Sequence, residues 1–162
     1  MFNKNAKRPR KFYKEIVMYK KVLAAVDFSE TSRLVLDAAL RLTNDNPARI
    51  HLIHVVQPVT EGYVLKVYTE NFQALEDDAV EQAAAQLKEF ETSDKIPADQ
   101  IHTVVGDRAG EIRRTCKDIE AEVIVIGSHG HSGQRRMLGA TANKLLHGAN
   151  SDILTVHAGD AT

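Results

Sequence analysis

Five short apolar runs, separated by stretches with helical spacing, constrain this chain more than any other feature. The runs are rich in Val, Ile and Leu, and they cover residues 21–28, 49–57, 99–107, 122–127 and 152–158. They are continuous rather than alternating with polar residues, which is typical of parallel strands buried on both faces. With right-handed crossovers, this order predicts an α/β fold with a single doubly wound five-stranded parallel sheet and helices on both faces.

The stretches between the runs predict helices. The first helix ends at Asn44–Pro47, and Ser29, with the polar residues after it, supplies N-cap chemistry at its start. Residues 71–93, 109–121 and 138–150 predict three more helices, whereas residues 58–70 are predicted to be irregular. The longest helix carries an apolar stripe made of Phe72, Leu75, Ala79, Ala83, Leu87 and Phe90.

Length and charge predict one domain with an added basic segment. The chain has 162 residues, 43% of them hydrophobic and 27% charged, and no apolar run approaches the ~20 residues of a membrane helix. Residues 1–17 hold six Lys or Arg and one acid, so we expect a disordered basic extension before a domain over residues 18–162. A contact of this arm with nucleic acid or anionic lipid is the alternative interpretation.

The single cysteine, Cys116, lies in a helix-like stretch and is interpreted as a small core residue. One cysteine cannot form an intrachain disulfide. This composition predicts a reducing, cytoplasmic setting.

The predicted sheet also indicates where a ligand would bind. In open parallel sheets, ligands lie outside the carboxyl ends of the strands, where the strand order reverses. The residues at these ends are Asp27, residues 54–57, Gly106 with Asp107, and the chain from Gly127 onward.

The stretch "GSHGHSGQRRMLGAT", residues 127–141, follows the fourth strand and leads into a helix. Backbone N–H groups can surround a phosphate only where the chain turns tightly and no Cβ blocks the approach. Gly127 and Gly130 would shape this loop, and Gly139, Ala140 and Thr141 would begin the helix. The pattern is neither a P-loop nor the dinucleotide fingerprint. From glycine spacing alone, an anion site and a plain connection both remain open.

Several motifs in order resemble the universal stress protein family from Met18 to about His157. They are "MYKKVLAAVDFSETS", "IHLIHVV", "VVGDRAGEIRRTCKDIEAEVIVIGSHG" and the stretch from Gly127 to "DILTVHA". The nucleotide-binding branch of the family carries Gly-x2-Gly-x9-Gly-Ser/Thr. Here the pattern is Gly127-x2-Gly130-x8-Gly139-Ala140-Thr141, so the gap is one residue shorter and Ala140 replaces the usual Ser. The shorter gap resembles a proteobacterial subgroup for which nucleotide binding is still expected.

The resemblance implies a stress-response regulatory protein that binds AMP or ATP, with or without Mg²⁺, and no resident cofactor. It assigns Asp27 to the adenine and ribose, and Val26 and Val55 to the adenine pocket. It also implies the strand order 3-2-1-4-5 and a homodimer paired through the edge strand at residues 152–158. Another branch of the family consists of dimeric interaction proteins that bind no nucleotide, and this is the alternative function.

Catalysis and metal binding are weakly indicated. His129 and His131 are two residues apart, but one such pair without further ligands at suitable spacing does not predict a metal site. Both are therefore interpreted as loop residues near the phosphates, and His129 is assigned to the nucleotide site. No nucleophile, base and orienting acid come together in the pattern, so we expect no catalytic residues and at most slow ATP hydrolysis. His54 lies within an apolar run and is interpreted as a core histidine.

Overall fold

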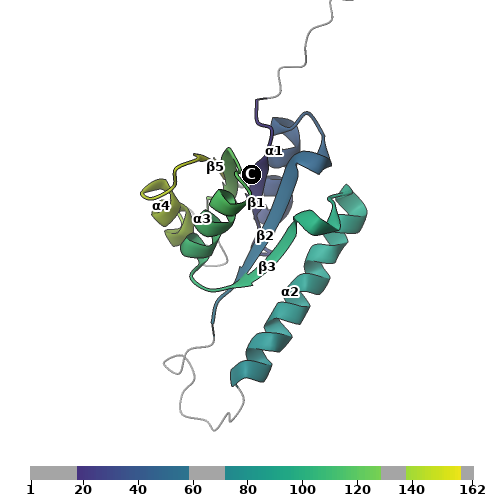
Figure 1. The fold of residues 1–162 in the computed structure, drawn as a ribbon, viewed down its shortest axis with the longest axis vertical. Coiled ribbons are helices and arrows are strands. Elements are labelled where there is room, and N and C mark those ends of the chain that lie inside the picture. Colours follow the sequence, from purple (N-terminus) through teal and green to yellow (C-terminus); the bar gives the residue numbers. More distant parts are fainter. Residues whose placement is uncertain (1–17, 59–71, 129–137, 158–162) are drawn as a thin grey trace, which may run out of the picture.

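A computed structural model of the chain describes residues 18–58, 72–128 and 138–157. These residues form three layers, with a parallel sheet between two pairs of helices (Figure 1). The strands are β1 (Val22–Ala25), β2 (Ile50–Val56), β3 (Ile101–Val105), β4 (Val123–Gly127) and β5 (Asp152–Val156). All neighbouring pairs are parallel, and the order is β3-β2-β1-β4-β5. The predicted fold class and strand order are confirmed.

The described helices are α1 (Thr31–Leu42), α2 (Phe72–Asp94), α3 (Arg108–Asp118) and α4 (Ala140–Leu146). Short 3₁₀ turns, η1 (Pro47–Arg49) and η2 (Ala98–Gln100), lead into β2 and β3. α1 and α2 pack on one face of the sheet, and α3 and α4 pack on the other.

The central strand β1 shows why the continuous apolar runs are required. Val22 and Ala24 belong to the core beneath α1 and α2, whereas Leu23 and Ala25 belong to the core beneath α3 and α4. Successive side chains of a strand point to opposite faces, so a strand covered on both sides must be apolar at every position. Cys116 is buried in the second core, as its interpretation as a core residue required.

Two local predictions differ from the structure. Glu30 is the N-cap of α1 and no side chain caps the helix, because the Ser29 hydroxyl donates to Asp27 instead. On α2, Ala83 and Leu87 are buried as the stripe predicted, but Leu75 is 44% exposed. The N-terminal end of α2 extends past the sheet (Figure 1), so the first turns of the stripe have no strand beneath them.

Some predictions fall outside the described residues. They are the basic extension at 1–17, nearly all of the irregular segment at 58–70, and the centre of the glycine loop with His129 and Gly130. Within the part of the chain that is described, no helix has both the length and the apolar character needed to cross a membrane.

Candidate functional site

A cavity of about 330 Å³ lies at the carboxyl ends of β1, β2 and β4. β1 sits between β2 and β4, so the chain order of the strands reverses at this point, where ligands of such sheets bind. Residues from distant segments meet here. The predicted site residues that line the cavity are Val26, Asp27, Val55, Gly127, Gly139, Ala140 and Thr141. The other two, His129 and Gly130, lie outside the described residues.

The cavity also contains residues that the sequence did not single out. α1 contributes Thr31, Ser32 and Val35, and α3 contributes Arg108 and Ile112. Both helices begin shortly after a strand ends. The residues just beyond Asp27 and Asp107 could therefore have been predicted to line the cavity from their positions in the sequence. His54 lines the cavity as well, in addition to the core role interpreted from its strand.

Asp27 organises the turn between β1 and α1. Its Oδ1 accepts hydrogen bonds from the Ser29 N–H at 3.0 Å, the Ser29 hydroxyl at 2.5 Å and the Ser32 hydroxyl at 3.3 Å. The Asp27 N–H lies 3.3 Å from the Ser32 Oγ. Asp27 thus satisfies local donors while also lining the cavity.

His54 contacts the same turn from β2. Its Nδ1 lies 2.9 Å from the Val26 carbonyl oxygen, and because that oxygen can only accept, Nδ1 carries the proton. The ring stacks on Phe28 with a centroid distance of 4.2 Å. Burial lowers the pKa of His54, and the charge of Arg108 lowers it further, while the bond to Val26 and the charge of Asp27 act in the opposite direction. His54 is therefore neutral at pH 7.

The opposite wall of the cavity is built from β4 and α4. The Gly139 N–H donates to the Ser128 carbonyl at 2.7 Å, which brings the start of α4 to the end of β4. Gly139 is the N-cap of α4, and no described side chain caps this helix. As at the start of every helix, the first backbone N–H groups of α4 have no partner within the helix.

The charged residues that line this cavity in the described part of the chain are Asp27 and Arg108. Arg108 is exposed and stands at the start of α3, whose N-cap Asp107 accepts from the Gly110 N–H at 2.9 Å. Within the same part of the chain, no three His, Cys, Asp or Glu side chains are grouped closely enough to hold a metal ion.

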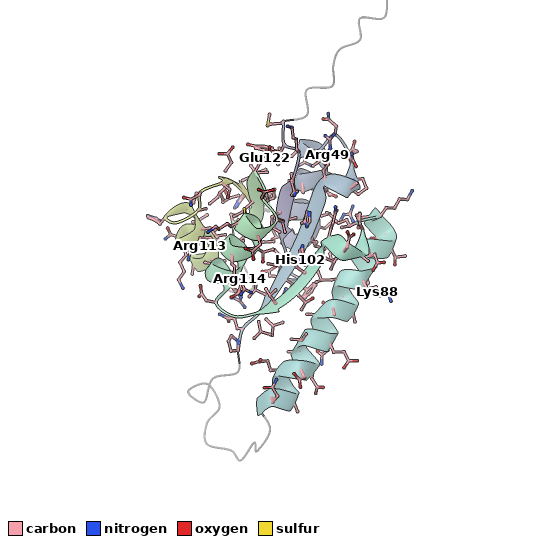
Figure 2. The ribbon with its side chains drawn as sticks, in the orientation of Figure 1. Arg49, Lys88, His102, Arg113, Arg114 and Glu122 are labelled. Carbon is pink, nitrogen blue, oxygen red and sulfur yellow. The ribbon has the colours of Figure 1, made fainter. Side chains whose placement is uncertain are left out.

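A second cavity, of about 440 Å³, lies between α3 and the segment that follows α4. Arg113 and Arg114 project from α3 on this side of the molecule (Figure 2). Arg113 donates to the Lys144 carbonyl at 3.3 Å, and Arg114 pairs with Glu111 at 2.5 Å. Arg113 thus bonds to a carbonyl near the end of α4, and Arg114 forms an ion pair within α3. None of the predicted site residues lines this second cavity.

Comparison with known proteins places this architecture in a family. The model of the universal stress protein family matches residues 18–157. This chain belongs to the universal stress protein family. It is 32% identical over 142 residues to universal stress protein A homolog 1 of Coxiella burnetii, with 85% of this chain and 96% of that protein covered.

Solved structures agree with this placement. The structure of hypothetical protein MJ0577 superposes with a TM-score of 0.74 at 25% identity, and covers 90% of this universal stress protein and 100% of its own chain. A universal stress protein solved in complex with cAMP superposes with a TM-score of 0.61 at 18% identity, covering 88% and 98% of the two chains. The latter likeness concerns the fold alone.

Proposed function

We propose that this universal stress protein is a stress-response regulator that binds an adenine nucleotide, AMP or ATP, in the cavity at the carboxyl end of the sheet. The observation that carries the proposal is the meeting of residues from β1, β2, β4 and α4, assigned separately to base, sugar and phosphate, around one cavity. Because this chain belongs to the family by its sequence, the cAMP complex of another family member supports, at the level of the family, an adenine nucleotide as the ligand class.

In this arrangement the adenine lies against Val26 and Val55. Asp27 accepts from the ribose or from the adenine amino group, because its negative charge disfavours a phosphate contact. The phosphates lie toward Gly127 and the start of α4, with His129 and Gly130 completing the glycine loop. The cavity thus has an apolar part for the base and backbone donors for the anion.

The gap between Gly130 and Gly139, one residue shorter than usual, supports the short-gap form of the nucleotide-binding branch, whereas Ala140 departs from the usual Ser. Ala140 has no hydroxyl, so one phosphate hydrogen bond is lost, at a cost of about 1 kcal/mol. The neighbouring Thr141 also lines the cavity and offers a hydroxyl in its place. We therefore expect binding, weaker than in a relative with Ser at this position.

The protein acts by binding rather than by catalysis. Phosphoryl transfer needs a metal-binding acid and a positioned lysine. Asp27 is the one carboxylate among the described lining residues, and its Oδ1 is already used in the turn. Hydrolysis of ATP is expected to be slow at most.

A second proposal concerns assembly. β5 is an edge strand, its Leu154 is 37% exposed, and an open apolar edge is an aggregation hazard. We propose that β5 pairs with its copy in a two-fold dimer, which would also serve the alternative role of an interaction protein without nucleotide. Wild-type protein should sediment as a dimer, and Leu154→Lys should sediment as a monomer. A wild-type monomer at micromolar concentration contradicts this.

The proposed ligand is tested by denaturing the purified protein and measuring the mass of the small molecule released. Calorimetry with AMP and with ATP, each with and without Mg²⁺, then measures affinity. We expect one adenine nucleotide per chain. An empty protein that gives no heat with either nucleotide overturns the proposal.

A further inference from the structure

His54 contacts both residues that flank Asp27. Its Nδ1–H donates to the carbonyl of Val26, one residue before Asp27, at 2.9 Å. Its ring stacks on Phe28, one residue after Asp27, with 29° between the ring planes. One imidazole from β2 therefore holds the turn of the neighbouring strand on both sides of the carboxylate.

The turn needs such support because its backbone is strained. Phe28 has φ of 61°, a conformation that bulky residues seldom adopt and that persists only where the surroundings impose it. Phe28 also packs against the core beneath α1 and α2. Release of its ring would let residue 28 return to ordinary φ values, and the Asp27 side chain would turn with it.

We propose that His54 is a positioning residue for ligand recognition, which fixes Val26 and Phe28 and thereby aims the Asp27 carboxylate into the cavity. The binding part of this inference rests on the proposed function. The part that concerns the turn does not.

The charge state of the ring explains why a histidine suits this position. Among the described residues, the charged groups that act on its pKa are Arg108 from α3, which lowers it, and Asp27 from the turn, which raises it. Burial keeps the ring neutral, so it donates to Val26 without attracting the carboxylate that it positions. A permanently charged donor at this place would pair with Asp27 and compete with the ligand.

Two substitutions separate the two contacts. His54→Phe keeps a ring for Phe28 but removes the donor to Val26, whereas His54→Asn keeps a side-chain N–H but removes the ring. His102→Phe is the matched control, because His102 is a half-buried histidine on the neighbouring strand and does not line the cavity. All three variants are compared at equal folded fraction, as judged by thermal unfolding.

The first measurement needs no ligand. The Ser29 amide bonds to Asp27 Oδ1, so its hydrogen exchange reports whether the carboxylate is held in place. We expect this amide to exchange about ten-fold faster in both His54 variants than in wild type, and His102→Phe to leave it unchanged. Unchanged exchange at Ser29 in His54→Phe and His54→Asn overturns the positioning role.

The second measurement is a double-mutant cycle on AMP affinity. His54→Phe should weaken AMP about ten-fold in the wild-type background and less than two-fold beside Asp27→Ala, because its effect passes through Asp27. Equal losses in both backgrounds contradict the proposal. If wild-type protein binds no AMP, the proposed function fails by itself, and the Ser29 exchange alone decides the role of His54.

Discussion

The two ends of the sheet use their polar groups differently. At the amino end, distant segments are joined directly: the Lys20 N–H donates to Glu122, the Lys21 ammonium to the Ile119 carbonyl, and the Tyr19 hydroxyl to Asp152. Glu122 lies at this end, where the chain enters the sheet (Figure 2). At the carboxyl end, Asp27 and Asp107 accept hydrogen bonds from their own turns, and a cavity is left between the elements.

This difference suggests that stability and recognition are separated along the strands. At the amino end, bonds between segments join the elements directly. At the carboxyl end, bonds within turns combine with bonds between segments, such as His54 to Val26 and Gly139 to Ser128, and these run around a cavity rather than closing it. Substitutions at the carboxyl end should therefore change ligand affinity, whereas substitutions at the amino end should change the free energy of unfolding.

The largest effect is expected in the glycine loop. If the glycine loop holds the phosphates as proposed, a Cβ at position 130 would block their approach, and Gly130→Val should weaken AMP binding by roughly 100-fold or more. Calorimetry measures the affinity, and thermal unfolding should show an intact fold. Gly148→Ala is the control, because Gly148 lies in the second cavity, and its added Cβ would displace the flexible end of Arg113 while keeping an ordinary 3.7 Å contact with the Lys144 carbonyl oxygen. Unchanged AMP affinity in Gly130→Val would show that this loop does not hold the phosphates.

The next effect concerns Asp27. Asp27→Ala should weaken the binding of AMP and of ATP to a similar extent, because both ligands share the adenosine half. The loss of binding free energy should be on the order of 1–3 kcal/mol. Titrations with and without Mg²⁺ distinguish this role from that of a metal-holding acid, which would affect only Mg²⁺–ATP. Asp27→Asn keeps an acceptor for Ser29 but removes the charge. If Asp27→Asn recovers the nucleotide affinity that Asp27→Ala loses, the loss is due to the disrupted turn rather than to the missing charge.

A smaller effect is expected from the histidine pair on β2 and β3. His51 Nδ1 lies 3.0 Å from His102 Nε2. Burial first, and then the charges of His102 and Lys21, lower the pKa of His51 from 6.5 to about 4. As pH falls below 6.5, His51 is protonated in the unfolded chain but stays neutral in the folded protein. The free energy of unfolding therefore decreases until about pH 4.

We expect this loss to be about 1–2 kcal/mol, because the half-buried ring is partly screened by solvent. Chemical denaturation at a series of pH values measures it. His51→Gln should flatten this part of the profile and leave AMP affinity at pH 7 unchanged. A profile that is as steep in His51→Gln as in wild type assigns the pH dependence to other groups.

The smallest effect is expected at the amino end. Tyr19→Phe removes the 2.9 Å hydrogen bond to Asp152, which is exposed, so the free energy of unfolding should fall by about 1 kcal/mol or less. AMP affinity should stay the same within error. A Tyr19→Phe variant with altered AMP binding breaks the separation between the two ends.

The fold could be predicted because continuous apolar runs and strand–helix alternation permit few arrangements. The ends of the elements were less accurate. β1 ends at Ala25 rather than at residue 28, because the Asp27 carboxylate accepts a hydrogen bond from the Ser29 amide and Phe28 adopts a positive φ. Neither the hydrogen bond nor the backbone angle can be predicted from the hydrophobic periodicity of the sequence.

The cavity could be predicted where its residues directly follow strands. Arg108 was missed because its place depends on where α3 crosses the sheet. His54 was interpreted from its strand as a core residue. Its stacking with Phe28 depends on the positive φ of Phe28, which the spacing of apolar residues does not predict.

Amide chemical shifts followed during titration with AMP test whether an adenine nucleotide binds at the carboxyl end of the sheet. Binding there should cause saturable changes at Val26, Val55, Gly127 and Thr141, with none at Tyr19 or Glu122. The contrary result is a spectrum that AMP does not change, or changes confined to α3 and Gly148 around the second cavity.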